Sequence, residues 1–335
     1  MSAATPVAQT RLSSLRKLIQ RRVSWLPVGA AVLILILMFV AGQSYFGRFL
    51  TPRLLSSLLV DNAYLIVLAA GMTFVILTGG IDLSVGAVMA FTGMLAAKLL
   101  STGVPTGVVI PLMIASGAIF GLIVGVLVNY FDVQPFIASL AGMFLARGLC
   151  FVVSLEAIQV KDTTVLGLQS VKLGTFEWYI TPTGIIALLV IVIAAWVLGY
   201  TRFGRTVYAI GGNEQSARLM GLPVARTKVL VYVISGICAG VAGLLFTAYT
   251  AAGYSLNGIG TELDTIASVV IGGTLLAGGS GYVIGSLIGV LVYGVIKVSI
   301  TFLGADSSWT RITIGILLLV FVVVQRVLVA RGSRR

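Results

Sequence analysis

The stretch WLPVGAAVLILILMFVAG, residues 25–42, contains no charged side chain. An α-helix rises about 1.5 Å per residue, so about 20 apolar residues cross the roughly 30 Å hydrocarbon core of a bilayer. Nine more apolar runs of similar length follow along the chain, at roughly 62–78, 83–100, 107–129, 134–154, 180–199, 228–251, 263–277, 281–303 and 309–328. The pattern predicts an all-α, polytopic membrane protein with about ten transmembrane helices.

The composition of the whole chain supports this prediction. Of its 335 residues, 59% are hydrophobic and 10% are charged, and the mean hydropathy is +1.11. A soluble domain would carry about 25% charged residues. The absence of histidine excludes Ser-His nucleophile activation and histidine zinc sites. We expect no catalytic residues, no metal and no cofactor.

Basic residues lie mainly in three segments that flank the apolar runs, and the net charge of +12 reflects them. Ten spans place these segments on one side, which the positive-inside rule assigns to the cytoplasm. We therefore predict a cytoplasmic tail at residues 1–22, a membrane domain at 23–329 with a cytoplasmic loop at 200–228, and a cytoplasmic tail at 330–335. Since the basic residues are explained in this way, we expect no nucleic-acid partner.

Two segments are expected on the opposite side of the membrane. Residues 43–61, which include Pro52, predict a short interfacial helix before the second span. Residues 155–179 form the longest external loop.

Two glycine-interrupted apolar regions resemble each other, ILTGGIDLSVGAVMAF at residues 76–91 and SVVIGGTLLAGGSGYVIGSLIGV at 268–290. Such paired regions suggest an internal repeat and a substrate route near the middle of the membrane. Close helix packing is a simpler explanation of the glycines, and the two explanations are compatible.

The stretch RTVYAIGGNEQSARLMGLPVARTK, residues 205–228, is polar and basic. Asn213 can cap a helix, Glu214 can pair with Arg218 four residues later, and Gly221 followed by Pro223 can end it. We predict a helix over 214–220 with Ala217 and Met220 on one face. Two turns are unstable alone, so this helix must dock either on its own protein or in a groove of a partner.

These residues, with GMTFVILTGGIDLSVGAVMAFTG (71–93), PFIASLAGMFLARG (135–148) and GTELDTIASVVIGGTLLAGGSGYVIG (260–285), resemble the sugar-importing ABC permeases of the ribose, arabinose and xylose type. The resemblance covers nearly the whole chain and is greatest for permeases of galactofuranose importers. It implies a permease subunit in the bacterial inner membrane that moves a monosaccharide inward from a sugar-binding protein.

The resemblance also implies partners. The 205–228 stretch matches the loop that such permeases insert into an ATP-binding subunit, which here would have two tandem cassettes. The implied coupling residues are Gly211, Gly212, Asn213, Glu214, Ala217, Arg218, Met220 and Gly221. The sequence has no GxxxxGK[ST] phosphate loop, so the ATPase must be another chain. A second permease subunit, identical or similar, and the lipid bilayer complete the expected partners.

The substrate pathway is predicted from polar residues inside apolar runs, since such residues are costly in a membrane. The candidates are Gly79, Gly80, Asp82, Ser84 and Asp264. For Asp82 and Asp264, capping of the following helix is an alternative to sugar contact. Two other functions remain open on these carboxylates, an ion-coupled secondary sugar transporter and an intramembrane aspartyl protease, although no GxGD-type sequence surrounds either residue.

Overall fold

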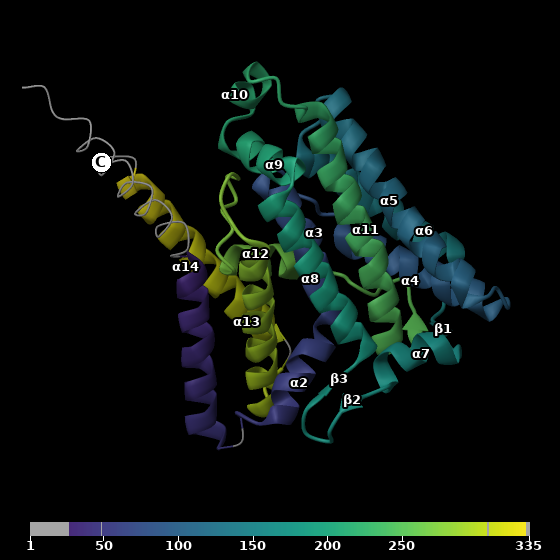
Figure 1. Ribbon diagram of the computed structural model, residues 1–335. Coiled ribbons are helices and arrows are strands. Elements are labelled where there is room, and N and C mark those ends of the chain that lie inside the picture. The colour runs from purple at the N-terminus through teal and green to yellow at the C-terminus, as the bar shows by residue number, and fades with distance from the viewer. Residues whose placement is uncertain (1–26, 48, 307, 333–335) are drawn as a thin grey trace, which may run out of the picture.

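The computed structural model describes residues 27–47, 49–306 and 308–332 (Figure 1). The N-terminal tail predicted at residues 1–22 and the last three residues of the C-terminal tail lie outside this range. A helix at Pro27–Phe46 is followed by α2 (Pro52–Asp61), α3 (Ala63–Leu77), α4 (Val85–Ser101), α5 (Thr106–Tyr130), α6 (Pro135–Val153), β1 (Ile158–Gln159), α7 (Thr163–Ser170), β2 (Leu173–Gly174), β3 (Tyr179–Ile180), α8 (Pro182–Tyr200), α9 (Arg202–Gly212), α10 (Glu214–Leu219), α11 (Val224–Thr250), β4 (Ala252–Gly253), α12 (Thr261–Ile271), α13 (Val283–Phe302) and α14 (Ser308–Gly332).

The polytopic helical architecture is confirmed, but the count of ten transmembrane helices is not. Six described helices are long and apolar enough to cross a membrane, and the bent pair α2–α3 raises the number to seven. Two further apolar helices, α4 and the described apolar part of α14, are shorter. Each predicted apolar run therefore contains a helix, but some of these helices are too short to span a bilayer alone.

The clearest difference concerns the run predicted at 263–277. Its helix, α12, has 11 residues and stops at Ile271. The chain then turns through glycines with positive φ, including Gly273 at +97° and Gly278 at +86°. Side-chain-bearing residues rarely adopt this conformation, so the glycines end the helix inside an apolar sequence.

The predicted short helix before the second span is present as α2. The Thr51 side chain accepts a hydrogen bond from the Leu54 amide, and Pro52 occupies the first helical position. Both features favour a helix start. The axes of α2 and α3 differ by 55°, so α2 is set at an angle to the following helix.

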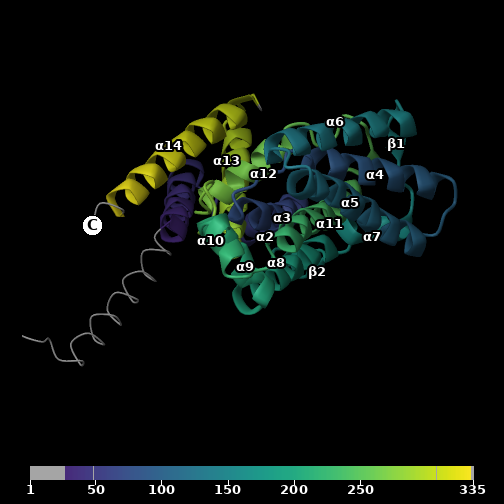
Figure 2. The ribbon, with the colours of Figure 1, turned by 90° about the horizontal axis from the view of Figure 1, so that it is seen from above.

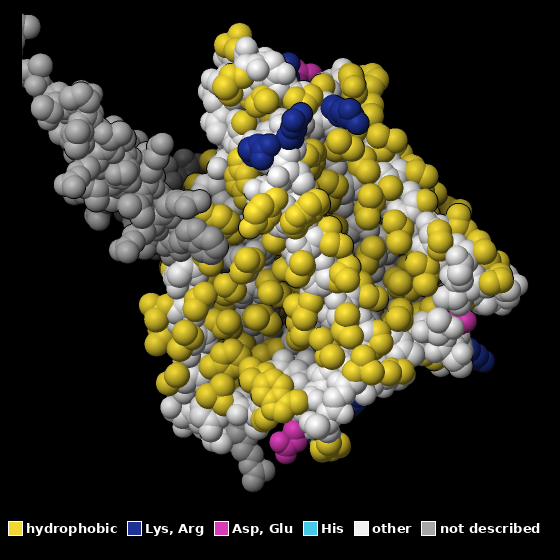
Figure 3. All heavy atoms as spheres, viewed as in Figure 1, with side chains coloured by type: hydrophobic (Ala, Val, Ile, Leu, Met, Phe, Trp, Pro, Cys, Tyr) yellow, Lys and Arg dark blue, Asp and Glu magenta, His cyan; other side chains and the backbone are white. Residues whose placement is uncertain are grey.

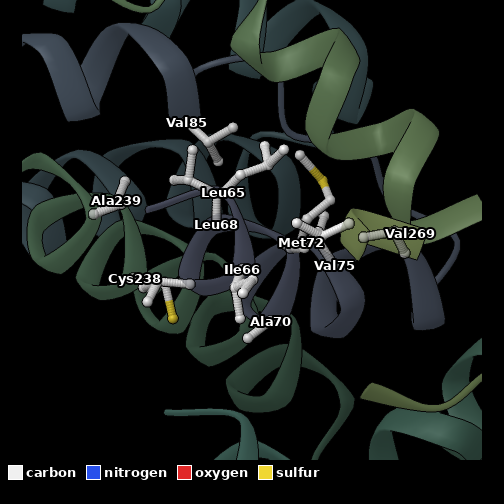
Figure 4. Close-up of a cluster of buried hydrophobic side chains, with 14 of the residues drawn as sticks. Leu65, Ile66, Leu68, Ala70, Met72, Val75, Val85, Cys238, Ala239 and Val269 are labelled. Atoms are coloured by element: carbon white, nitrogen blue, oxygen red, sulfur yellow. The ribbon is translucent and has the colours of Figure 1, made fainter. Parts of the chain in front are cut away.

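Helix α3 lies at the centre of the bundle, and every one of its residues except Tyr64 is buried. Figure 4 shows its side chains packed with residues of α4, α11 and α12, among them Val85, Cys238 and Val269. A helix that is apolar on all sides is expected to be surrounded by other helices, which explains this position.

Glycines bring α5 and α11 into close contact. A Cβ on Gly117 would overlap the Gly236 carbonyl oxygen, and a Cβ on Gly236 would overlap the Gly117 carbonyl oxygen. One turn further along each helix, a Cβ on Gly121 would overlap the Tyr232 carbonyl oxygen, and a Cβ on Gly240 would lie 2.8 Å from the Met113 carbonyl oxygen. Small residues at this spacing let membrane helices approach closely, so close packing does explain part of the glycine content.

The two ends of the bundle differ. Helices α9 and α10 lie together at one end, and α2, α7, β2 and β3 lie at the other (Figure 1). Viewed from the α10 end, α14 and α13 lie on the opposite flank from α5 and α7 (Figure 2). The segment predicted as an external loop at 155–179 contains α7. Its strand β1 pairs antiparallel with β4, which follows α11, and β2 pairs antiparallel with β3.

Candidate functional site: the α9–α10 segment and the glycine breaks

The α10 helix forms as the sequence predicts and is one residue shorter. The Asn213 side-chain oxygen accepts a hydrogen bond from the Ser216 amide at 2.7 Å. Glu214 pairs with Arg218 Nη2 at 2.6 Å, and Gly221 has a φ of +75° just after the helix. The capping, pairing and termination predicted for this segment are therefore all present.

One contact of Glu214 was missed. Its second carboxylate oxygen accepts from Lys228 Nζ at 2.8 Å, which ties α10 to the start of α11. Partial burial raises the pKa of Glu214, but hydrogen bonds from Lys228 and Arg218 outweigh this effect and hold the pKa below its usual value of 4.5.

The two sides of α10 have different environments. Ala217 is fully buried in a small apolar cluster with Ile210 and Val224. Leu219 and Met220 are 85% and 66% exposed. The prediction that Ala217 and Met220 share a face is wrong, because the helix ends at Leu219 and Met220 follows it, turned away from the cluster. The α10 helix thus docks on its own protein through Ala217 and exposes two large apolar side chains.

The α9 helix packs directly on both glycine-interrupted regions. A Cβ on Gly211 would overlap the Leu77 carbonyl oxygen and the Gly279 amide nitrogen. The Gly279 amide itself donates to Leu77 O at 2.9 Å, and a Cβ on Gly278 would lie 2.8 Å from the Gly79 nitrogen. We call the contact of Leu77, Gly79, Gly211, Gly278 and Gly279 the glycine junction.

Two other residues of α9, Tyr208 and Gly212, differ in their contacts with the glycine break after α12. Tyr208, one turn before Gly212, donates its hydroxyl proton to the Gly281 carbonyl oxygen at 2.8 Å, which adds a polar contact beside the glycine junction. By contrast, a Cβ on Gly212 would have no neighbour within 4 Å among the described residues. Gly212 therefore approaches the break only with its backbone, since its nitrogen would lie 2.9 Å from a Cβ on Gly279, whereas the Cβ position of Gly211 points into the contact.

Asp82 is 1% exposed and lies in the break between α3 and α4. Its Oδ1 accepts from the Ser84 amide at 2.9 Å and from the Ser84 hydroxyl at 2.6 Å. Its Oδ2 accepts from the Ser235 hydroxyl of α11 at 2.8 Å. The structure thus brings Asp82 and Ser84 together, and Asp82 links the break to α11.

Gly80 lies beside the same group. A Cβ there would lie 2.6 Å from the Tyr232 hydroxyl oxygen, and this buried oxygen has no hydrogen-bond partner among the described residues. Asp264 belongs to a different group, since its Oδ2 accepts from Tyr293 at 3.0 Å. No hydrogen bond joins Asp82 to Asp264 in the described part of the chain, so the two carboxylates are not a facing pair.

Asp264 lines a cavity of 420 Å³ with Tyr293, Lys297 and Arg311. Lys297 also lines a second cavity of 510 Å³, together with Asp61, Asn62 and Tyr249. Sequence reasoning missed Asp61, Tyr293 and Lys297. Each is a single polar residue in or next to an apolar run, which was the signal that identified Asp82.

Arg147, a charge inside the apolar run of α6, is also accounted for. Its Nη1 donates to the carbonyl oxygens of Ser255 and Asn257, both at 2.7 Å. These two hydrogen bonds hold the loop before α12 against α6. They offset the free-energy cost of placing a charged side chain in an apolar helix.

The chain matches a known protein family over most of its length. Residues 54–322 match the family model described as the permease component of the branched-chain amino acid transport system. No solved structure matches the chain at a significant level.

Individual relatives are sugar permeases. The fructose import permease protein FruG of Bifidobacterium longum is 45% identical over 92% of this chain and 93% of that protein. The inner membrane ABC transporter permease protein YjfF of Escherichia coli is 44% identical over 91% of this chain and 94% of its own length. The ribose import permease protein RbsC of Bacillus subtilis is 38% identical over 83% and 86%. The chain therefore belongs to the permease family of ABC importers, in its branch of sugar permeases of the ribose type.

Proposed function

We propose that this permease carries a monosaccharide, galactofuranose or a related sugar, from an external sugar-binding protein into the cytoplasm of a bacterium. The similarity to FruG and RbsC supports a sugar as substrate. Galactofuranose comes from the resemblance of motifs such as GGIDLSVG, and the names of the relatives include fructose, ribose and allose. The names of the relatives therefore support a sugar as the substrate class, and the motif resemblance supports galactofuranose as the sugar.

The observation that carries the proposal is the two-sided placement of the α9–α10 segment. Outward, Leu219 and Met220 offer an exposed apolar pair to a partner. Inward, Gly211 packs against Leu77 and Gly279 in the glycine junction. A partner that grips α10 would therefore push directly on the backbone of both breaks. The proposed partner is an ABC ATPase with two tandem cassettes, and Asn213, Glu214, Ala217, Arg218 and Gly221 shape and hold the segment that it grips.

We also propose an orientation of the permease in the bilayer. The α9–α10 end faces the cytoplasm, where ATP is available, and both termini lie on that side. The α2–α7 end then faces the sugar-binding protein. A second permease subunit, identical or similar, completes the membrane part of the importer.

The sugar pathway is proposed to include the two cavities that share Lys297. Neutral sugars present many hydroxyl groups, and Asp61, Asn62 and Asp264 offer oxygen acceptors and an amide within reach of these cavities. Ligand sites commonly combine such polar groups with aromatic side chains, and Tyr249 and Tyr293 supply these here. Gly79, Gly80, Asp82 and Ser84 would act further along the path, where the break lets the pathway open.

The experiment is uptake of labelled sugar by vesicles that contain the permease, the ATPase and the binding protein. We expect uptake to require ATP on the side of the membrane that carries the ATPase. Uptake should persist when ion gradients are collapsed with ionophores. Labelled galactose, fructose and ribose identify the sugar, and competition by methyl galactofuranoside or methyl galactopyranoside, whose rings do not interconvert, identifies the ring form. Uptake that follows an ion gradient without ATP would instead support the secondary transporter.

A further inference from the structure

Two cavities meet at the α9–α10 end of the bundle, and the proposed function assigns a ligand to neither, although Gly279 of the glycine junction lines the second. The first has a volume of 770 Å³ and lies between α9 and the start of α11, where Arg202, Arg205 and Arg226 line it. The second, also 770 Å³, lies along α8 and is lined mainly by apolar side chains. Arg205 lines both, so the basic cavity and the apolar groove are adjacent.

The three arginines lack acidic partners. In the described part of the chain, the ion pairs are those of Glu214 with Arg218 and with Lys228. No described Asp or Glu lines either cavity. Figure 3 shows Lys and Arg side chains gathered at this end of the molecule, above a broad hydrophobic surface. Three unpaired guanidinium groups around one cavity favour an anionic ligand.

The apolar groove has the length of one lipid leaflet. It extends along α8 from Tyr200 back to Ile191, with Trp196 between them. Nine residues of helix rise about 13 Å, and half of a bilayer's hydrocarbon core is about 15 Å. Trp196 and Tyr200 are 59% and 78% exposed, and aromatic residues at a helix end mark the membrane interface.

We propose that these two cavities together bind an anionic phospholipid. The phosphate lies among Arg202, Arg205 and Arg226, and one acyl chain lies in the groove along α8. A zwitterionic headgroup fits less well, because its ammonium group would add positive charge to a cavity that already holds three unpaired arginines. The lipid would thereby rest against α9, the helix that carries Gly211.

The position of Trp196 in the groove provides a direct assay. Trp25, Trp178 and Trp309 are replaced by Phe in the full chain, which leaves Trp196 as the fluorophore. The chain is reconstituted in phosphatidylcholine vesicles that contain either brominated phosphatidylglycerol or brominated phosphatidylcholine at equal mole fraction. Bromine quenches tryptophan on contact, so the quenching curves give the relative association constants of the two lipids.

We expect phosphatidylglycerol to be preferred at least fivefold, since a basic residue near an anionic membrane surface contributes about 1 kcal/mol, or roughly fivefold. The triple change Arg202→Gln, Arg205→Gln and Arg226→Gln should abolish this preference, and Arg205→Gln alone should reduce it several-fold. Lys172→Gln, which removes a cation at the opposite end, should leave it unchanged. The single change carries the test if the triple variant does not fold.

Equal quenching by the two lipids in the parent chain would overturn the proposal, as would a preference that survives Arg205→Gln and the triple change. Inorganic phosphate at millimolar concentration should not relieve the quenching. Relief would identify free phosphate as the ligand and overturn the lipid assignment. If the triple variant loses the ATPase but the parent shows no lipid preference, the arginines form part of a protein interface instead.

Discussion

Gly211 of α9 packs against Gly279, in the turn between α12 and α13, with no side chain between the two backbones. The Gly279 amide donates to the Leu77 carbonyl oxygen at 2.9 Å, which brings the end of α3 into the same contact. Segments from three distant parts of the sequence therefore meet at backbone level. Because protein interiors are close-packed, a displacement of α9 must be shared by the two breaks.

The exposed pair on α10 is predicted to carry most of the ATPase contact. Burial of one large apolar side chain contributes about 1.5–3 kcal/mol. The double change Leu219→Gln and Met220→Gln should therefore weaken ATPase binding at least tenfold, measured by co-purification and titration in detergent. Leu173→Gln, an exposed leucine at the opposite end, serves as the control. Undiminished ATPase binding by the double variant would rule out this contact.

Asp82 is predicted to stabilise the break between α3 and α4. Asp82→Ala leaves the hydroxyls of Ser84 and Ser235 without their acceptor, and a buried polar group that loses its partner costs about 1–3 kcal/mol. Asp82→Asn keeps one acceptor oxygen, so its effect on thermal unfolding should be smaller. Sugar affinity of the separate binding protein should be unchanged in both cases. If both variants unfold at the parent temperature and transport normally, Asp82 is replaceable.

The Glu214 contacts predict a specific pH dependence. The pKa of Glu214 in the folded protein lies below 4.5, its value when unperturbed. Stabilisation from a carboxylate with a lowered pKa is complete above the unperturbed value and is lost as the pH falls through the folded pKa. Limited proteolysis of the α9–α10 segment should therefore be constant from neutral pH to about 5 and increase only at lower pH. Glu214→Gln should be more susceptible at neutral pH and lack this acid step.

The proposed orientation can be tested with single cysteines. Cys150 and Cys238 are buried, so introduced cysteines should dominate labelling by a membrane-impermeant maleimide. Gly212→Cys should react only from the cytoplasmic side, and Glu177→Cys only from the outside. Reaction of both positions from the same side would contradict the orientation.

Local features of the chain were predictable from sequence because they depend on neighbouring residues. The cap by Asn213, the pair of Glu214 with Arg218 and the stop at Gly221 all involve residues within a few positions of one another. The apolar runs likewise each contain a helix in the structure, although some of these helices are too short to span a bilayer alone.

Features that depend on three-dimensional packing were not predictable. The sequence could not show that the 263–277 run ends its helix at Ile271, because its apolar residues continue through the turn. It could not show that Gly211 contacts Leu77, a residue more than a hundred positions earlier in the chain. Nor could it show that Lys297 lines two cavities. Asp61 and Lys297 are each recognisable in the sequence as a polar residue in or next to an apolar run. Only the fold shows that both line the same cavity.

Gly211→Ala and Gly212→Ala, compared in vesicles with the ATPase and the binding protein, show whether α9 acts on the breaks through Gly211. Alanine is preferred to glycine in a helix by about 1 kcal/mol, so neither change should harm α9 itself. Gly211→Ala places a methyl group into the glycine junction, whereas Gly212→Ala meets nothing within 4 Å among the described residues. We predict that Gly211→Ala retains the ATPase but loses at least nine-tenths of ATP-driven sugar uptake, a tenfold loss that corresponds to about 1.4 kcal/mol, while Gly212→Ala transports normally. Normal uptake by Gly211→Ala at normal abundance in the membrane would contradict the central claim that α9 acts on the breaks through this contact.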